Sequence, residues 1–190
     1  MELSVIAYLT LLLIVALLRV VELQISRRHQ RELVKHGAQK VVDPRFRWMV
    51  LLHTGVLIGA ALEVVFLHRP FYPVFAAVCF AIFVAANVVR WWVIRTLGEH
   101  WNVQVVNSTG MGVITTGPFR YVRHPNYAAV FVEMLVLPLI HCAWITAVIG
   151  SAAHIVVLSQ RLATEERVLF TDARYREVMS GKPRFVPGLF

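Results

Sequence analysis

The chain has 190 residues, of which 58% are hydrophobic, with a mean hydropathy of +0.65 and a formal net charge of +8 at pH 7. This length fits one domain, and the apolar content exceeds what a small soluble core can bury, which excludes an ordinary soluble protein and indicates a lipid-facing surface. Lys and Arg in cytoplasmic loops explain the positive charge, and no nucleic-acid-binding motif is present, so no nucleic-acid partner is expected.

The first predicted element is a membrane span over Leu3–Val21. It has no basic segment before it and no small-residue cleavage site after it, which predicts a retained helix and not a signal peptide. The segment Gln24–Arg47 that follows carries seven Lys and Arg against two acidic residues. We therefore expect it in the cytoplasm, with the N-terminus outside, as an amphipathic helix on the membrane surface that Gly37 ends.

Two further spans and a polar loop make up the middle of the chain. The spans are expected at Trp48–Leu67 and Phe71–Ile94, joined by an outer turn over His68–Pro73, and the loop Thr96–Asn126 follows in the cytoplasm.

Tyr127–Ser159 reads as a helical hairpin. Its first arm is expected to end near Pro138, its turn to lie at His141–Trp144, and both arms are short for a full span. A charged cytoplasmic helix from Gln160 is expected to close with Gly181 and Pro183. The fold class is thus an all-α integral membrane protein with about five transmembrane helices, the last two as a hairpin, plus cytoplasmic amphipathic and C-terminal helices.

The stretch Thr115–Glu133, TTGPFRYVRHPNYAAVFVE, concentrates cationic and aromatic side chains at the start of an apolar helix. Gly117-Pro118 predicts a turn, Pro125 fits the first helical position, and His124 before it is expected at the N-cap. A helix N-terminus beside Arg120 and Arg123 favours an anionic group such as a carboxylate or phosphate. A basic cluster that touches lipid headgroups remains the alternative.

Arg161 and Glu165 are four residues apart in the C-terminal helix and share one face, with Glu166 rotated away. One interpretation is an ordinary intrahelical ion pair. The other is a site at the membrane interface, where the arginine steers an anion and the carboxylate holds a cation. A ligand with a carboxylate and a positive centre suits this set.

Four ionisable residues fall inside apolar spans, where such groups are candidates for function: His53, Glu63, Glu133 and His154. We interpret Glu63 as an anchor near the outer surface and Glu133 as a core hydrogen-bonding group or a cavity residue. No pair of histidines has metal-ligand spacing, and Cys79 and Cys142 lie in apolar stretches, so no metal site or disulfide framework is predicted.

The motif GPFRYVRHPNY, followed by RLATEERVL, YREVM and a closing FVPGLF, resembles the isoprenylcysteine carboxyl methyltransferase family of integral membrane enzymes. The N-terminal half is similar to a bacterial branch of that family that is implicated in methylating alkylpyrones and long-chain phenolic products. The bacterial inner membrane is the expected location, with the active site and C-terminus in the cytoplasm.

This resemblance implies S-adenosylmethionine as methyl donor, entering from the cytoplasm, and a lipophilic or prenylated acceptor arriving from the bilayer. It also implies one domain over 1–190, with N-terminal membrane helices at 1–95 and a cofactor-binding catalytic core at 96–190. The implied cofactor-binding residues are Gly117, Pro118, Tyr121, Arg123, His124, Pro125, Tyr127 and Glu165. Arg161 is the implied acceptor-orienting residue and, with Glu165, catalytic.

The expected reaction is O-methylation of a prenylcysteine carboxylate or of an alkylpyrone or phenolic hydroxyl. Three alternatives stay open: a phospholipid N- or thiol S-methyltransferase, a sterol-type reductase of related membrane fold, and a non-catalytic protein whose basic loop binds anionic lipid. The sequence does not decide the acceptor or the oligomeric state.

Overall fold

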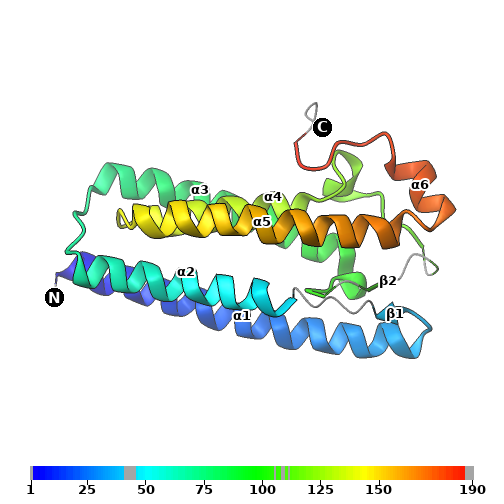
Figure 1. Cartoon of the computed structure of the whole chain (residues 1–190), viewed down its shortest axis with the longest axis horizontal. Coiled ribbons are helices and arrows are strands. Elements are labelled where there is room, and N and C mark those ends of the chain that lie inside the picture. Colours follow the sequence, from blue (N-terminus) through cyan, green and yellow to red (C-terminus); the bar gives the residue numbers. More distant parts are fainter. Residues whose placement is uncertain (1, 41–45, 105, 108–109, 111, 187–190) are drawn as a thin grey trace.

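The computed structural model describes residues 2–40, 46–104, 106–107, 110 and 112–186. Residues 41–45, which belong to the predicted segment Gln24–Arg47, and the end of the FVPGLF motif lie outside this range. The chain is almost entirely helical (Figure 1). Its helices are α1 Leu3–Lys35, α2 Phe46–Phe66, α3 Pro73–Leu97, α4 Pro125–Leu139, α5 Trp144–Leu169 and α6 Ala173–Met179, with 3-10 turns η1 Gly98–His100 and η3 Gly117–Arg120.

Four of the described helices, α1, α2, α3 and α5, are long and apolar enough to cross a membrane, and α4 is a shorter apolar helix. The prediction of an all-α membrane protein is confirmed. At about 1.5 Å per residue the 15 residues of α4 span roughly 22 Å, less than the ~30 Å of a bilayer core. The first arm of the hairpin is therefore short, as expected, whereas the second arm, α5, has 26 residues and is longer than predicted.

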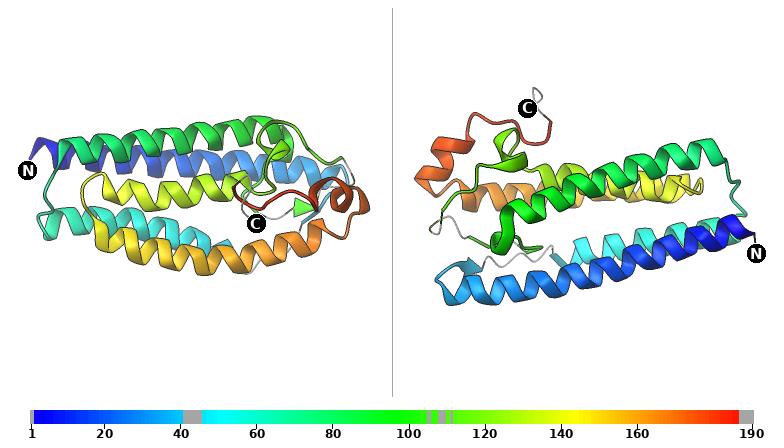
Figure 2. Two further views of the ribbon diagram at one scale, coloured as in Figure 1. Left: turned by 90° about the horizontal axis from the view of Figure 1, so that it is seen from above. Right: turned by 180° about the vertical axis from the view of Figure 1, so that it is seen from behind.

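The long helices run nearly parallel in two groups, with α1 beside α2 and α3 to α5 packed across from them (Figures 1 and 2). Along the bundle, α3 packs on α4, α4 on α5, and α5 on α2. The N-terminus and the turns after α2 and α4 lie at one end, while α6 and the short antiparallel pair β1 Gln39–Lys40 and β2 Val106–Asn107 lie at the other. Because apolar faces of four helices converge, the core sits between the two groups.

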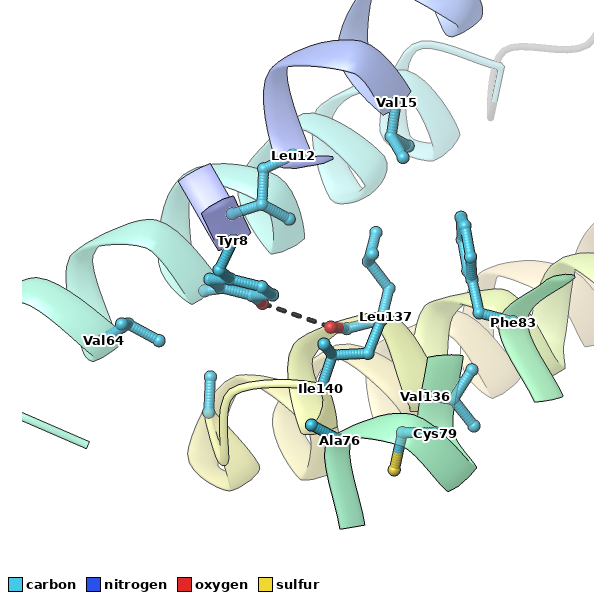
Figure 3. Close-up of a cluster of buried hydrophobic side chains, with 12 residues drawn as sticks. Tyr8, Leu12, Val15, Val64, Ala76, Cys79, Phe83, Val136, Leu137 and Ile140 are labelled. Carbon is cyan, nitrogen blue, oxygen red and sulfur yellow. Dashed lines mark hydrogen bonds between the residues drawn. The ribbon is translucent and has the colours of Figure 1, made fainter. Parts of the chain in front are cut away.

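The core at the N-terminal end draws side chains from α1 to α4 (Figure 3). Tyr8 lies at its centre, and its hydroxyl donates a hydrogen bond of 3.2 Å to the carbonyl of Leu137. This carbonyl precedes Pro138, which lies inside α4. The bond satisfies the polar tip of a buried tyrosine where water is excluded.

One prediction about the first helix is wrong. We expected a span that ends at Val21 and a separate helix on the membrane surface, but α1 continues without a break from Leu3 to Lys35. Its 33 residues reach roughly 50 Å, which exceeds the bilayer core. The basic end of the helix therefore extends beyond the membrane, and Gly37, two residues after Lys35, has a φ of +93° that suits glycine.

The charged helix expected from Gln160 continues directly from the membrane arm, as a site at the membrane interface requires, but it does not run as one helix to Gly181. Arg161, Glu165 and Glu166 belong to the last turns of α5, which continues to Leu169, and the charged tail then forms the short α6. Nothing in the sequence around Gln160 breaks a helix, so the membrane arm simply extends into the polar region. Asp172 caps α6 by accepting a 2.8 Å hydrogen bond from the Tyr175 N–H.

Glu63 lies at the end of the bundle away from Arg161 and Glu165, as expected, but it is buried and caps a helix instead of anchoring the chain at the interface. Its buried carboxylate accepts hydrogen bonds from the backbone N–H of Ile145 at 3.1 Å and of Thr146 at 2.7 Å, and it pairs with Arg69 at 2.8 Å. The residue before α5 is Ala143, whose side chain cannot cap a helix. Glu63 supplies that cap from α2.

Candidate functional site

The Gly-Pro turn and the RHPNY segment fold as the sequence predicts. Gly117 opens η3 at a φ of +57°, and a Cβ at this position would lie 2.5 Å from the Oγ1 of Thr96 in α3. His124 is the N-cap of α4 and Pro125 its first residue. A glycine is thus required both by the backbone and by the close approach of η3 to α3.

The C-terminal tail holds this segment in place. The backbone N–H groups of Arg123 and His124 donate to the carbonyls of Pro183 and Arg184 at 2.9 and 2.8 Å. Nearby, Lys182 Nζ donates to the Phe119 carbonyl at 2.8 Å, and burial lowers the pKa of this lysine. The tail thereby fixes the entry of the chain into α4.

Glu166 holds the residues of the RHPNY segment in place, a role that the sequence analysis did not predict. It does point away from Arg161, as predicted, but it lies against His124 Nε2 at 3.2 Å, Arg123 Nη1 at 3.2 Å and Arg184 Nη2 at 2.7 Å. Its carboxylate raises the pKa of Arg184 by hydrogen bonding and charge. The pair Glu165-Glu166 in the sequence was the signal that could have indicated this role. Glu166 faces Arg123 and His124, and Glu165 faces the cavity described below.

Tyr127 links the two residues predicted to be catalytic. Its hydroxyl donates to the Glu165 carboxylate and accepts a 3.0 Å hydrogen bond from Arg161 Nε. Arg161 also donates to the Val103 carbonyl, and His124 Nδ1 lies 4.0 Å from the Glu165 Oε1. The RHPNY segment and the end of α5 therefore meet, as the predicted topology required.

The extension of α1 fastens the loop that follows η1. Ser26 Oγ accepts from the Val103 N–H at 2.8 Å, His29 Nδ1 donates to the Trp101 carbonyl at 3.0 Å, and Gln30 bonds the Gln104 amide at 3.0 Å. Residues 101–104 are thus held between α1 and Arg161 of α5. The part of α1 that we expected on the membrane surface instead supports the loop 101–104, which lines the site.

These elements enclose a continuous cavity of about 540 Å³, within the range of roughly 300–1,000 Å³ that ligand pockets occupy. One half lies among loop residues and helix ends, and the other lies between the membrane helices. The first half is lined by residues that include Trp101, Asn102, Val103, Gln104, Arg123, His124, Asn126, Tyr127, Arg161, Glu165 and Tyr175. The second half is lined by residues that include Ala16, Arg19, Val20, Glu22, Val50, His53, Thr54, Leu57, Ile58, Arg90, Val130 and His154.

The polar half combines charges of both signs with unpartnered polar atoms. The amide Oδ1 atoms of Asn102 and Asn126 and the Nε of Arg123 are buried without a hydrogen-bond partner among the described residues. Burial also raises the pKa of Tyr175, which keeps its hydroxyl neutral at physiological pH. This half can receive a ligand that donates hydrogen bonds to the amides and carries both a carboxylate and a cation.

The membrane half contains an ion network. Arg19 pairs with Glu22 at 2.8 Å and with Glu133 at 2.6 Å, and Arg90 pairs with Glu22 at 2.5 Å, which joins α1, α3 and α4. Of these, Glu133 does not line the cavity, and its role as a core hydrogen-bonding group is the one that the structure supports. Two arginines and two glutamates leave the network without net charge.

The predicted site residues fall into two groups. Six of them line the cavity: Arg123, His124, Pro125, Tyr127, Arg161 and Glu165. Gly117 and Pro118 shape the turn behind it, and Tyr121 is 54% exposed on the surface and does not line it. The structure thus supports structural roles for the Gly-Pro turn and brings together the residues on either side of the hairpin.

Residues 77–171, half of the chain, match the isoprenylcysteine carboxyl methyltransferase (ICMT) family. The chain belongs to this family. The ICMT family consists of membrane methyltransferases, and the matched range includes the RHPNY segment, the hairpin and the paired glutamates. A solved structure of the eukaryotic intramembrane Ras methyltransferase ICMT is similar in fold, with a TM-score of 0.58 and 18% sequence identity. That match covers 78% of this chain and 55% of the eukaryotic one, so this chain spans about half of that protein.

Two bacterial relatives match over most of their length. The uncharacterized protein YpbQ of Bacillus subtilis (strain 168) is 26% identical over 159 residues, which cover 84% of this chain and 94% of the relative. An uncharacterized protein of Haemophilus influenzae (strain ATCC 51907 / DSM 11121 / KW20 / Rd) is 27% identical over 153 residues, covering 80% of this chain and 88% of the relative. The ICMT-type chain is thus similar to bacterial proteins of comparable extent.

Proposed function

We propose that this ICMT-type membrane protein is an S-adenosylmethionine-dependent O-methyltransferase that acts on a lipophilic acceptor. The main support for the proposal is that one continuous cavity is polar at one end and apolar between the membrane helices. A polar, zwitterionic donor and a greasy acceptor meet where the two halves join. Tyr127, Arg161 and Val130 line the cavity near that junction.

The residues of the polar half fit the donor. Arg123 and the N-terminal end of α4 at His124 suit the donor carboxylate, and Glu165 suits its ammonium group. The unpartnered amide oxygens of Asn102 and Asn126 suit the hydroxyl and amino groups of its nucleoside. When bound, the donor supplies a methyl group on a sulfonium sulfur.

The membrane half suits the acceptor. Val20 of α1 and Ile58 of α2 line the cavity and are 51% and 54% exposed. We infer that the cavity opens toward the lipid between α1 and α2, where these exposed side chains lie. A lipid tail enters there without crossing the polar half.

Arg161 orients the acceptor oxygen in this proposal. The guanidinium is buried and fixed by Tyr127 and by the Val103 carbonyl, so it is positioned before the acceptor arrives. An ionised carboxylate or enol needs no proton removal, and holding it in line is the main contribution of the protein. A neutral phenol requires a base, and Glu165 and His124 are the groups in reach of this part of the cavity.

The test is calorimetric binding of S-adenosylhomocysteine to the detergent-purified protein. The parent is expected to bind at micromolar concentration, and Glu165→Gln and His124→Ala are expected to bind roughly 10- to 100-fold more weakly, because each loses a hydrogen bond to a charged group. Glu99→Gln changes an exposed carboxylate in η1 and serves as the matched control. Absence of binding to a folded parent protein would reject the proposal.

A further inference from the structure

Two histidines face each other in the membrane half of the cavity and have no part in the proposed donor site. His53 of α2 and His154 of α5 both line the cavity, and their ring centroids are 5.5 Å apart at an interplanar angle of 79°. His154 is only 1% exposed. Phe131 of α4 stacks on its ring at 6.1 Å and fixes its orientation.

The hydrogen bonds of this pair are incomplete. His53 Nδ1 lies 2.7 Å from the Met49 carbonyl, and a carbonyl only accepts, so Nδ1 carries the proton and Nε2 of the neutral ring is an acceptor. His154 Nδ1 is buried and has no hydrogen-bond partner among the residues that the structure describes. A buried polar atom left unpaired costs stability, so a ligand group that pairs with it binds favourably.

The charges around the pair favour a neutral ligand group. Arg19 and Arg90 line the same half of the cavity, but Glu22 and Glu133 neutralise them within the ion network. The surrounding wall is apolar and includes Val50, Leu57 and Val130. A carboxylate or phosphate would lose its hydration there without gaining a free cation, which is costly. A neutral hydroxyl that forms hydrogen bonds in the cavity loses much less.

We propose that His53 and His154 form a second polar subsite, which binds a hydroxyl group on the acceptor. A hydroxyl both donates and accepts, so it pairs with the Nε2 of His53 and with an N–H of His154 at the same time. His154 and Arg161 are seven residues apart on one face of α5, about two turns or roughly 10 Å. The hydroxyl therefore lies deeper in the membrane than the methylated oxygen, where the acceptor head joins its tail.

This inference rests on the proposed function and narrows its substrate class to lipids with a second, unmethylated hydroxyl. The test compares two synthetic probes, 4-(1-hydroxyhexadecyl)phenol and 4-hexadecylphenol, which differ by that hydroxyl. Their binding to the detergent-purified protein is measured by calorimetry with saturating S-adenosylhomocysteine. The hydroxylated probe is expected to bind about 3- to 10-fold more tightly, as one added hydrogen-bonded group implies.

His53→Phe and His154→Phe are each expected to reduce this ratio to about one while leaving S-adenosylhomocysteine affinity unchanged. His141→Phe is the matched control, because His141 is also fully buried and its ring nitrogens have no hydrogen-bond partner within the described part of the chain, yet it packs on Tyr8 and Phe71 outside the cavity. That variant is expected to keep the ratio of the parent.

The outcomes separate the two proposals. Equal binding of the probes, binding of neither probe, or a ratio that survives in both histidine variants would overturn the hydroxyl subsite while S-adenosylhomocysteine binding stands. Failure of the parent to bind S-adenosylhomocysteine would overturn the donor site itself.

Discussion

At the scale of single residues, the paired glutamates at the end of α5 have different environments. Glu165 lines the cavity and accepts from Tyr127, whereas Glu166 lies behind the site against Arg123, His124 and Arg184. A carboxylate that faces a ligand and one that holds the protein together respond differently to the loss of charge. Substituting each in turn separates these roles.

Glu166→Gln is expected to lower the melting temperature, because two arginines and a histidine lose their common partner, at a cost of about 1–3 kcal/mol. Glu165→Gln is expected to leave the melting temperature within a few degrees of the parent. Thermal unfolding followed by intrinsic fluorescence in detergent measures both. A destabilised Glu165→Gln beside an unaffected Glu166→Gln would reverse the assignment.

Gly117 allows a second prediction at this scale. Gly117→Ala places a methyl group against Thr96 and forces a left-handed backbone on alanine, which costs roughly 1–2 kcal/mol for the backbone alone. In the double variant Gly117→Ala, Thr96→Ala the contact with the Thr96 Oγ1 is gone but the backbone strain is not. The melting temperature is therefore expected to recover only in part, and full recovery would show that the φ of +57° is immaterial.

At the scale of elements, α5 depends on a cap that comes from another helix. Glu63→Ala removes the acceptor for the N–H groups of Ile145 and Thr146, and we expect a loss of about 1–2 kcal/mol in unfolding free energy. The cap lies at the opposite end of α5 from Arg161 and Glu165. Affinity for S-adenosylhomocysteine is therefore expected to stay unchanged in a calorimetric titration, and a concomitant loss of affinity would contradict a purely structural cap.

The elements themselves were largely predictable, and the contacts between them were not. Apolar length identifies α2 and α3 to within three residues, and Pro125 after His124 marks the start of α4 because its ring suits only the first turn. By contrast, the sequence does not tell whether a helix stops at the membrane surface, so the unbroken extension of α1 beyond Val21 was missed. The caps and clamps made by Glu63, Glu166 and Ser26 are long-range contacts that no local pattern encodes.

At the scale of the whole molecule, the two ends differ in charge. The exposed Arg27, Arg28 and Arg31 lie near the end of α1, at the end of the bundle that carries α6, as the positive-inside tendency requires of a cytoplasmic face (Figure 1). The turn after α2 lies at the other end. We therefore propose that the N-terminus is outside and that the polar half of the cavity opens to the cytoplasm.

Single cysteines in a cysteine-free background test this orientation. Leu67→Cys, at the end of α2, is expected to react with a membrane-impermeant maleimide in intact spheroplasts, and Gly181→Cys, after α6, only after lysis. Both positions are exposed, so accessibility within the fold does not distinguish them. The reverse labelling pattern would place the donor site outside the cell.

The central claim is that the chain transfers a methyl group from S-adenosylmethionine to an oxygen of a membrane lipid. The most direct measurement is incubation of the purified protein in lipid nanodiscs with methyl-tritiated S-adenosylmethionine and a bacterial lipid extract, followed by counting of the organic phase with and without mild alkaline hydrolysis. We predict label in the organic phase that Glu165→Gln abolishes, released as methanol if the product is an ester and retained if it is an ether. If neither the organic phase nor the released methanol carries label, or if Glu165→Gln gives as much label as the parent, the proposed methyl transfer would be contradicted.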